Sequence, residues 1–361
     1  MRKRQILRNT LLLACLVMLP RAEAQRGRAA SFQRSAVSGQ LLDDLAVPPP
    51  AAGNRRDENL SAARRNEELV AQNAPAAGKT GPFWKATSGG NTIYLLGSIH
   101  AGSKGMYPLP KEFEDAFAAS STLIVEVDVN KVDKQKMQAM MLSKGMYAGD
   151  DSLWDHVSPE TRKLVEQFCD KYQLPAGSFA NLKPWAVAIS ASLLPMVKAG
   201  MDPSLGVDQH FLDKVDQGGK KKTVVEIESA EGQLNLISGF SEELQEKLLA
   251  LALEQSNKPL EIKKLEDLWM SGDVAGVEAA MKEDAGPPEF EKAMVHDRNP
   301  HMADVAEQYL KGKDQAFLVV GVAHMIGTDG VVSLLEKRGY KIEQVTLAEQ
   351  RVQEEKSTPA K

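Results

Sequence analysis

Two matching motifs, far apart in the chain, set the strongest constraint on its fold. Each joins an apolar, β-like run to the pattern Gly-x-x-His: the first extends from Tyr94 to His100 and the second from Phe317 to His324. Glycine has no Cβ, so a ligand can approach the backbone closely where each strand ends, and the histidine lies at the rim of a sheet. A single histidine at a strand end is more often structural, but the repetition favours a function. Two such histidines, brought together by the fold, predict a metal or catalytic centre.

The first residues have the pattern of an export signal. Basic residues precede a short apolar run and the small-residue pattern that ends at Ala24. The apolar run is too short to span a membrane comfortably. We therefore predict a signal peptide over residues 1–24, cleavage after Ala24, and a protein that is exported to a periplasm or secreted. Lipoprotein anchoring at Cys15 is the less favoured alternative, because the apolar run continues past this residue.

Residues 25–80 have the composition of a disordered linker. They contain three consecutive prolines, dense arginine and little apolar periodicity, so they cannot bury enough surface to offset the entropy of ordering. Their positive charge predicts a weak contact with an anionic membrane surface, which salt would screen. We expect the folded domain to cover residues 81–350 and the last residues, 351–361, to form a flexible tail.

The bulk composition is that of an ordinary globular protein. Of 361 residues, 43% are hydrophobic and 26% are charged, and the formal net charge is −5. This acidic balance gives no concentrated basic face and argues against a nucleic-acid partner. Removal of the signal peptide would leave Cys169 as the one cysteine, which excludes an intramolecular disulfide and a thiolate zinc site.

The hydrophobic periodicity alternates between strands and helices, which is typical of an α/β protein. The expected strands lie at residues 92–97, 122–129, 223–228, 315–321 and 341–346. A helix over 110–119 joins the first two strands and predicts a compact βαβ unit. Helical patterns cover 158–172, 185–198, 207–215, 241–254, 259–271, 273–283 and 289–311, the last with an expected break at Asn299-Pro300. We therefore predict mixed β-sheets flanked by helices, with a large helical insertion between the second and later strands.

Acidic residues occupy two strands where apolar residues are expected. Glu126 and Asp128 share one face of the second strand by period-two alternation. Glu226 and Glu228 do the same in the third. A half-exposed sheet would explain them as a solvated face. The competing interpretation is a shared polar site at the strand ends, because carboxylates and neutral imidazoles are usual ligands of a divalent metal that activates water.

Two further segments carry polar residues that could support such a site. Asp208, near the start of an expected helix, could cap it, and His210 is assigned to the surface or to a supporting role. Arg298 could clamp a carboxylate or phosphate with its planar guanidinium, although a surface ion pair is the plainer interpretation. The sequence lacks H-E-x-x-H, G-x-S-x-G, Walker A and G-x-G-x-x-G patterns, which argues against zincin, serine-hydrolase and nucleotide-binding functions. The histidines that lie in no motif, and are interpreted as ordinary residues, are His156, His296 and His301.

In this order the motifs resemble the TraB/PrgY/GumN family, whose animal relatives include the Tiki proteases. The resemblance extends from about Phe83 to Thr346. The segments that carry it are Tyr94–His100, Met106–Pro110, Glu126–Asp128, Gly206–Asp208, Glu226–Glu228 with Gln233, Arg298–Asn299 and Val320–Gly330. It implies an α/β fold with mixed sheets and a metal-dependent hydrolase centre built from the two histidines and nearby acids. The Tiki branch is associated with proteolysis that uses manganese or cobalt, whereas other branches are linked to peptide pheromone shutdown or to exopolysaccharide genes.

We predict a divalent-metal centre with His100, Glu126 and His324 as ligands, and with manganese, cobalt or zinc as the metal. Glu228 is expected close by, as a further ligand or as general base, and Arg298 is expected to bind a substrate carboxylate or an oxyanion. The function expected from this centre is that of an exported metal-dependent hydrolase, a protease or peptidase that acts on a peptide or protein. The alternative is a non-catalytic protein that binds a peptide or glycan and retains the same fold.

Overall fold

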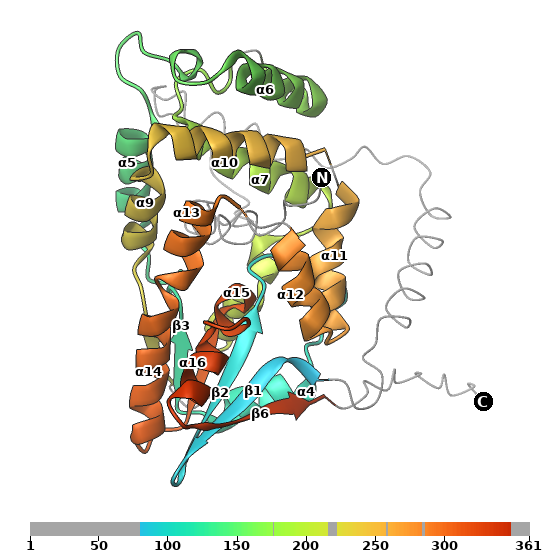
Figure 1. Ribbon diagram of the computed structural model, residues 1–361, viewed down its shortest axis with the longest axis vertical. Coiled ribbons are helices and arrows are strands. Elements are labelled where there is room, and N and C mark those ends of the chain that lie inside the picture. Colours follow the sequence, from blue (N-terminus) through green and yellow to red (C-terminus); the bar gives the residue numbers. More distant parts are fainter. Residues whose placement is uncertain (1–79, 176, 216–221, 258, 284–285, 348–361) are drawn as a thin grey trace, which may run out of the picture.

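Figure 1 shows the computed structural model of the chain. The structure describes residues 80–347 apart from 176, 216–221, 258 and 284–285. The predicted signal peptide and tail lie outside these residues, and so do Cys15 and the predicted linker except for Thr80, which begins the first strand. Among the described helices, none combines the length and the apolar character that a membrane crossing requires.

In the described part of the chain, six strands form one mixed sheet. They are β1 (Thr80–Ser88), β2 (Asn91–Ser98), β3 (Thr122–Val125), β4 (Thr223–Glu226), β5 (Ala316–Gly321) and β6 (Lys341–Thr346). The strand order is β4-β3-β5-β2-β1-β6. The four strands from β4 to β2 are parallel neighbours, and β1 pairs antiparallel with β2 and β6. The predicted α/β fold with a mixed sheet is confirmed.

Three details of the sheet differ from the sequence prediction. The five predicted strands omit β1, whose start contains Gly and Pro and shows little alternation. The predicted βαβ unit is wrong in one respect: β2 and β3 are not adjacent, because β5 inserts between them. The strand β3 ends at Val125, directly before its acids, and β4 ends at Glu226. Acidic side chains are costly in a strand covered on both faces, so Glu126 lies just beyond the strand end.

The register of β2 and β5 places the two Gly-x-x-His motifs side by side. Gly97 pairs with Val320 and Ser98 with Gly321, in parallel orientation. Both motifs therefore leave the sheet at its carboxyl edge, where ligands bind in open parallel sheets. A Cβ on Gly97 would lie 2.9 Å from Val322 Cγ2, so glycine permits the close approach of the two motifs.

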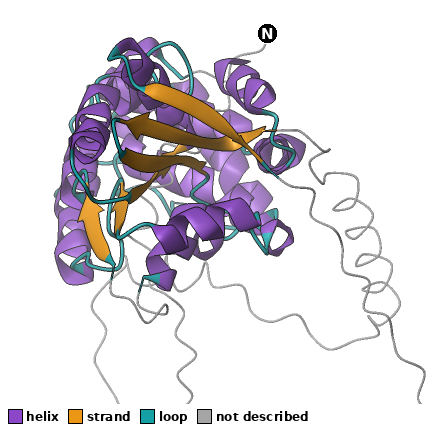
Figure 2. Ribbon diagram, turned by 90° about the horizontal axis from the view of Figure 1, so that it is seen from below, coloured by secondary structure: helices purple, strands orange, loops and turns teal. Residues whose placement is uncertain are grey.

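Helices cover both faces of the sheet, as Figures 1 and 2 show. One layer consists of α4 (Lys111–Ala119), α8 (Val207–Lys214), α11 (Pro259–Met270) and α12 (Val274–Glu283). The opposite layer consists of α14 (Asn299–Lys311) and α16 (Val331–Lys337). Period-two alternation divides the strand side chains between the layers. Phe83 and Leu96 lie in the first core, and Trp84 and Leu95 lie in the second.

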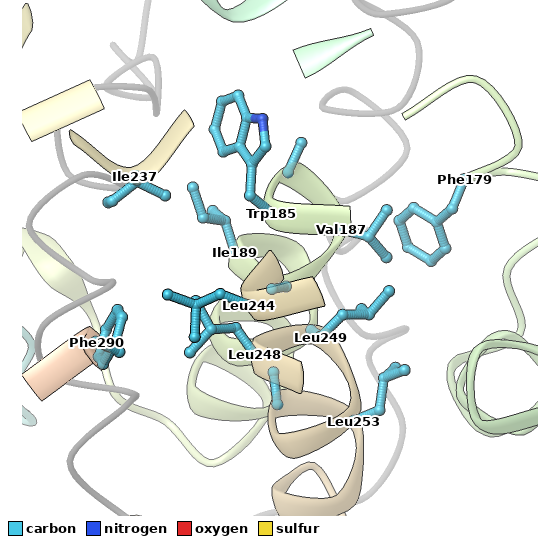
Figure 3. Packing of buried hydrophobic residues seen from close by; sticks show 14 of the residues in the cluster. Phe179, Trp185, Val187, Ile189, Ile237, Leu244, Leu248, Leu249, Leu253 and Phe290 are labelled. Atoms are coloured by element: carbon cyan, nitrogen blue, oxygen red, sulfur yellow. The ribbon is translucent and has the colours of Figure 1, made fainter. Parts of the chain in front are cut away.

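A third group of helices stands above the carboxyl ends of the strands (Figure 1). It consists of α5 (Lys134–Gly145), α6 (Pro159–Tyr172), α7 (Pro184–Lys198), α9 (Ala230–Ser238), α10 (Glu242–Gln255) and α13 (Pro288–Glu291). At its centre α7 packs against α10, and their apolar cluster includes Trp185, Leu248, Leu249 and Phe290 (Figure 3). α7 is buried on nearly all sides, which its apolar sequence permits. This group forms part of the helical insertion that the sequence predicts between the second and later strands, and α8, α11 and α12 of the same stretch cover the sheet instead.

Helix ends follow local sequence signals. Ser158, Ser229 and Ser241 each accept a hydrogen bond from the backbone N–H three residues later, and so cap α6, α9 and α10. The sequence prediction nevertheless omits α9, which is short. The predicted helix over 289–311 breaks before Asn299, as expected at an Asn-Pro pair. The remaining described elements are the 3₁₀ turns η1 (Lys104–Met106), η2 (Leu153–Asp155) and η3 (Pro203–Leu205), the π-helix η4 (Lys292–His296) and α15 (Val322–Met325).

Candidate functional site

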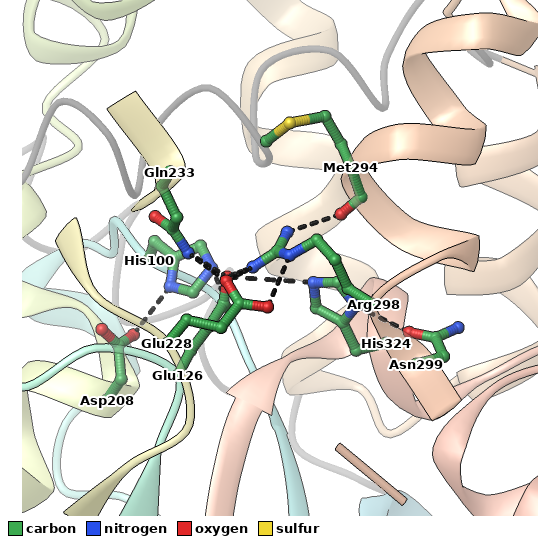
Figure 4. Close-up of polar contacts among 9 residues, drawn as sticks. All are labelled: His100, Glu126, Asp208, Glu228, Gln233, Met294, Arg298, Asn299 and His324. Atoms are coloured by element: carbon green, nitrogen blue, oxygen red, sulfur yellow. Dashed lines mark hydrogen bonds and ion pairs between the residues drawn. The ribbon is translucent and has the colours of Figure 1, made fainter. Parts of the chain in front are cut away.

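Three predicted residues converge at the carboxyl edge of the sheet (Figure 4). His100 follows β2, Glu126 follows β3, and His324 lies in α15, directly after β5. Glu126 lies between the two imidazoles: its Oε2 is 3.9 Å from His100 Nε2 and its Oε1 is 3.9 Å from His324 Nε2. All three side chains are almost completely buried. Because β5 lies between β2 and β3, the sheet topology itself brings these three strand ends together.

Each histidine is anchored through Nδ1. The Nδ1–H of His100 donates to Asp208 Oδ1 (3.1 Å). The Nδ1–H of His324 likewise donates to Asn299 Oδ1 (2.7 Å). The amide of Asn299 is itself oriented, since its Nδ2 donates to the carbonyl oxygen of Asp329 (3.0 Å). With Nδ1 protonated, a neutral ring at either position presents the lone pair of Nε2 to the central carboxylate, which is the arrangement usual for metal-ligating histidines.

Arg298 holds the acidic side of the site. Its Nε donates to Glu228 Oε1 (2.8 Å) and its Nη2 to Glu228 Oε2 (2.7 Å), which makes a bidentate pair. Nη2 also donates to Glu126 Oε1, and Nη1 donates to the carbonyl oxygen of Met294 (2.5 Å). Acceptors therefore surround the guanidinium, and 9% of the side chain is exposed. Arg298 clamps two carboxylates of the protein, while its binding of a substrate group stays a prediction.

The π-helix η4 explains how the guanidinium of Arg298 reaches its acceptors. The N–H of Asp297 bonds to the carbonyl oxygen of Lys292, five residues earlier (2.8 Å), so this turn is wider than an α-helical turn. The backbone N–H of Arg298 bonds to the carbonyl of Val295 (3.2 Å). The carbonyl of Met294, four residues before Arg298, accepts the side-chain bond instead. Single π-turns of this kind are frequent at functional sites.

Gln233, on α9, reinforces the acidic side. Its Nε2 donates to Glu126 Oε1 (2.8 Å) and to Glu228 Oε2 (3.1 Å). Together with the bonds from Arg298, this means that both carboxylate oxygens of Glu228 accept hydrogen bonds. The two oxygens of Glu126 differ, because its buried Oε2 has no hydrogen-bond partner among the described residues. A buried carboxylate oxygen without a partner is costly, and this one lies on the side of His100 Nε2.

The buried charges shift pKa values in opposite directions. Burial opposes the ionisation of Glu126, but the charge and hydrogen bond of Arg298, together with the two histidines, outweigh it, and the pKa of Glu126 falls to about 2. Burial, aided by the charge of Arg298, lowers the pKa of His324 to about 3. Burial also acts against a proton on His100, yet the charge and hydrogen bond of Asp208 raise its pKa. At pH 7, Glu126 is therefore a carboxylate and His324 a neutral imidazole.

Gly321 keeps space open in front of His100 Nε2. A Cβ on Gly321 would lie 3.0 Å from this nitrogen and 3.7 Å from His324 Cδ2. Among the residues that the structure describes, no three His, Cys, Asp or Glu side chains have the spacing of a metal site. Around a tetrahedral metal, neighbouring N and O ligands are about 3.4 Å apart, given bonds of about 2.1 Å. The N–O distances of 3.9 Å slightly exceed that value, while imidazole and carboxylate are donor types that divalent cations use.

The structure brings the five predicted site residues together: His100, Glu126, Glu228, Arg298 and His324. Two neighbouring acids do not join them. Asp128 binds Lys131 Nζ (2.8 Å), and Glu226 Oε2 accepts from the backbone N–H of Asp128 (3.2 Å). These two acids stabilise the turn after β3, where the alternation of a strand no longer applies.

Sequence reasoning missed the roles of three polar residues in the site. Asp208 was expected to cap α8, but Gly206 occupies the N-cap position and Asp208 turns to His100. Gln233 and Asn299 had no predicted role, although they belong to the segments on which the resemblance rests. Their positions could have indicated these roles, because Asn299 directly follows Arg298 and Gln233 lies one helical turn into α9. His210 lies outside the centre and binds Glu114 Oε1 (2.8 Å).

A sequence model described as the TraB/PrgY/gumN family matches residues 82–344. The chain is 26% identical to the protein YbaP of Escherichia coli (strain K12) over 163 residues, which are 45% of this chain and 56% of YbaP; the match to YbaP of Shigella flexneri has the same extent. A protein of Treponema pallidum (strain Nichols) is 19% identical over 273 residues, 71% of this chain and 80% of that protein. The chain thus spans about half the length of the YbaP proteins, and no solved structure matches it.

Proposed function

Because the chain belongs to the TraB/PrgY/gumN family, we propose that it is a metal-dependent hydrolase whose centre consists of His100, Glu126 and His324. One observation carries the proposal: Glu126 lies between two anchored imidazoles, each with Nε2 at 3.9 Å from a different carboxylate oxygen. Two histidines and one carboxylate form a ligand set of catalytic metal sites, which leave a position for water or substrate. Imidazole and carboxylate donors suit manganese, cobalt or zinc.

The charges around the centre support a cation there. Two carboxylates, from Glu126 and Glu228, pair with the guanidinium of Arg298, and a third, from Asp208, lies behind the ring of His100 at its Nδ1. Buried charges need compensation, and the excess in this group is negative. Oε2 of Glu126, which has no hydrogen-bond partner among the described residues, offers a further lone pair to a cation in this region.

The residues around the centre have separable roles in the proposed hydrolysis. A divalent cation held there would lower the pKa of a water molecule towards neutrality and so supply a nucleophile at pH 7. Glu228 is our candidate for the general base, since 19% of its side chain is exposed, against 5% for Glu126. Arg298 and Gln233 hold Glu228 in one orientation, and Arg298 remains our candidate for contact with a substrate carboxylate or oxyanion.

The proposed substrate is a peptide or protein, which makes the enzyme a protease or peptidase. Export to a periplasm or secretion, and contact of residues 25–80 with a membrane surface, are part of the same proposal and rest on the sequence alone. The alternative is a non-catalytic protein that binds a peptide or glycan. Buried carboxylates beside imidazoles favour the enzyme, because such groups lower stability and are typical of catalytic sites.

The proposal is tested by manganese binding, measured by calorimetry and by metal analysis of the purified protein. His100→Ala and His324→Ala should each weaken binding by about tenfold or more. Gly321→Ala keeps every donor but adds a methyl group 3.0 Å from His100 Nε2, so it should also weaken binding without removing a ligand. His301→Ala, an exposed position on α14, is the matched control. Unchanged binding in both ligand variants removes the proposal.

A second measurement separates enzyme from binding protein. The purified protein is incubated with a peptide library and manganese, cobalt or zinc, and products are identified by mass spectrometry. An enzyme should yield cleaved peptides that disappear with Glu228→Gln, because the amide cannot accept the proton. Peptide binding without cleavage under all three metals would support the alternative.

A further inference from the structure

An exposed His–Asp pair joins two segments that border the centre. His296 Nδ1 contacts Asp329 Oδ2 directly. His296 is the last residue of the π-helix η4, and Asp329 lies in the loop between α15 and α16. About half of each side chain is exposed, 47% and 46%. The pair therefore lies at the surface, whereas the groups that it connects are buried.

The two segments hold opposite sides of the centre. The π-helix leads directly into Arg298, whose guanidinium holds Glu126. On the other side, the carbonyl oxygen of Asp329 accepts from Asn299 Nδ2, and Asn299 Oδ1 accepts from His324 Nδ1. The backbone position of Asp329 thus fixes the amide of Asn299, and the amide fixes the ring of His324.

The loop that contains Asp329 is otherwise held from the side of α16. Ser333 Oγ donates to the carbonyl oxygen of Gly327 (2.8 Å), and Lys337 Nζ donates to that of Thr328 (2.5 Å). Gly327 itself has a φ of +88°, which allows the chain to turn sharply there. The contact with His296 ties Asp329 to η4 as well. The contact therefore limits the movement of the Asp329 carbonyl oxygen, which accepts the hydrogen bond from Asn299 Nδ2.

We propose that His296 and Asp329 are positioning residues for the metal centre and act through Asn299 on His324. This inference rests on the proposed function, since orientation of His324 matters most when its Nε2 is a ligand. Groups that orient ligating histidines raise metal affinity. The effect of an exposed pair that acts through a further residue is expected to be small, about threefold in the dissociation constant.

The plainer explanation is an ordinary surface ion pair, and η4 supplies a control for it. Lys292 Nζ pairs with Asp297 Oδ1 (2.5 Å) at the same π-helix, with side chains 68% and 54% exposed. That pair has a similar chemistry and location but no contact with Asn299. Removing it should leave the centre unchanged, whereas removing the pair of His296 and Asp329 should not.

The first test uses hydrogen exchange of the metal-free protein and is independent of the proposed function. In His296→Ala, amides of the 326–330 loop should exchange about threefold faster, and those at the start of α14 should follow. In Lys292→Ala, the exchange rates of the same amides should match those of the wild type. Equal exchange rates of these amides in His296→Ala and Lys292→Ala would overturn the inference, whatever the protein binds.

The second test measures manganese affinity in a double-mutant cycle. His296→Ala and Asp329→Ala should each raise the dissociation constant about threefold, and the double variant should show about the same threefold change, because one interaction is lost in all three. His296→Asn, which keeps a donor for the carboxylate, should restore most of the affinity. Additive losses, or no rescue by asparagine, contradict the proposal. If the wild-type protein binds no metal, the proposed function fails, and the exchange result alone decides whether the pair positions Asn299.

Discussion

The helix pair α7–α10 and the strand-end site are both buried, but different side chains are buried in each. Around the helix pair, apolar groups such as Trp185 and Leu248 leave water and thereby stabilise the fold (Figure 3). At the strand ends, charged and polar groups leave water, and each needs a partner to offset its desolvation (Figure 4). The helix pair therefore contributes stability, whereas the strand ends lower it in exchange for a reactive arrangement of charges.

The largest expected effect comes from removal of the guanidinium at the strand ends. Arg298→Met leaves the buried Glu126 and the half-buried Glu228 without their cation, so the metal-free protein should lose about 4 kcal/mol of unfolding free energy. Manganese should recover part of this loss, because a cation can replace the missing charge. Urea unfolding with and without manganese measures both. The control is Arg162→Met, which breaks the exposed pair with Glu166 and should change stability by less than about 1 kcal/mol.

A truncation in the helix pair should lower stability without touching the metal. Leu248→Ala should cost about 3 kcal/mol, because Leu248 is 1% exposed and a cavity would remain. Manganese affinity of the folded protein should stay within about twofold of the wild type, measured by calorimetry well below the unfolding temperature. A tenfold loss of affinity would show that the two regions are energetically coupled and would end their separation.

The smallest expected effect concerns a buried acid that belongs to neither region. Glu266, on α11, accepts a hydrogen bond from Ser103 Oγ (2.7 Å), its Oε2 has no partner among the described residues, and burial raises its pKa. A raised folded-state pKa means that the folded protein binds the proton more tightly than the unfolded chain. Stability from Glu266 is therefore present at acidic pH and is lost as pH rises through the raised value.

Glu266→Gln stays neutral at every pH and should lack this alkaline loss. The variant should gain about 1 kcal/mol over the wild type at the alkaline end of a series of unfolding measurements from about pH 5 to about pH 9. Glu336→Gln, an exposed position on α16, should show no such trend. If the gain in unfolding free energy of Glu266→Gln over the wild type grew towards acidic pH, the assignment of the proton to Glu266 would be contradicted.

Local patterns in the sequence were sufficient to predict most helices and strands. They also predicted that the two histidines belong to one centre. The strand of residues 341–346 is observed at the predicted bounds, and the cap at Ser158 begins α6 as expected. The repeated motif placed His100 and His324 at the rim of a sheet and indicated a shared centre. Period and capping act over a few residues, so a sequence displays them directly.

Contacts that join distant segments were not predictable from such patterns. Nothing in residues 316–321 specifies that β5 inserts between β2 and β3. The bond between His100 and Asp208 depends on how α8 packs beside β2, and the bond between Asn299 and Asp329 depends on two loops. These partners are chosen by tertiary packing, which propensity and spacing do not encode.

The central position of β5 also determines when the site can exist during biosynthesis. β5 separates a β1–β2 hairpin from a β3–β4 pair, so the sheet becomes continuous only after residues 316–321 have emerged from the ribosome. Until then each half has an open edge that could pair with another chain, and holdase chaperones would have surface to protect. His324 follows β5 immediately, so the same segment that closes the sheet delivers the second imidazole. A nascent chain therefore carries no assembled centre before its fold is nearly finished.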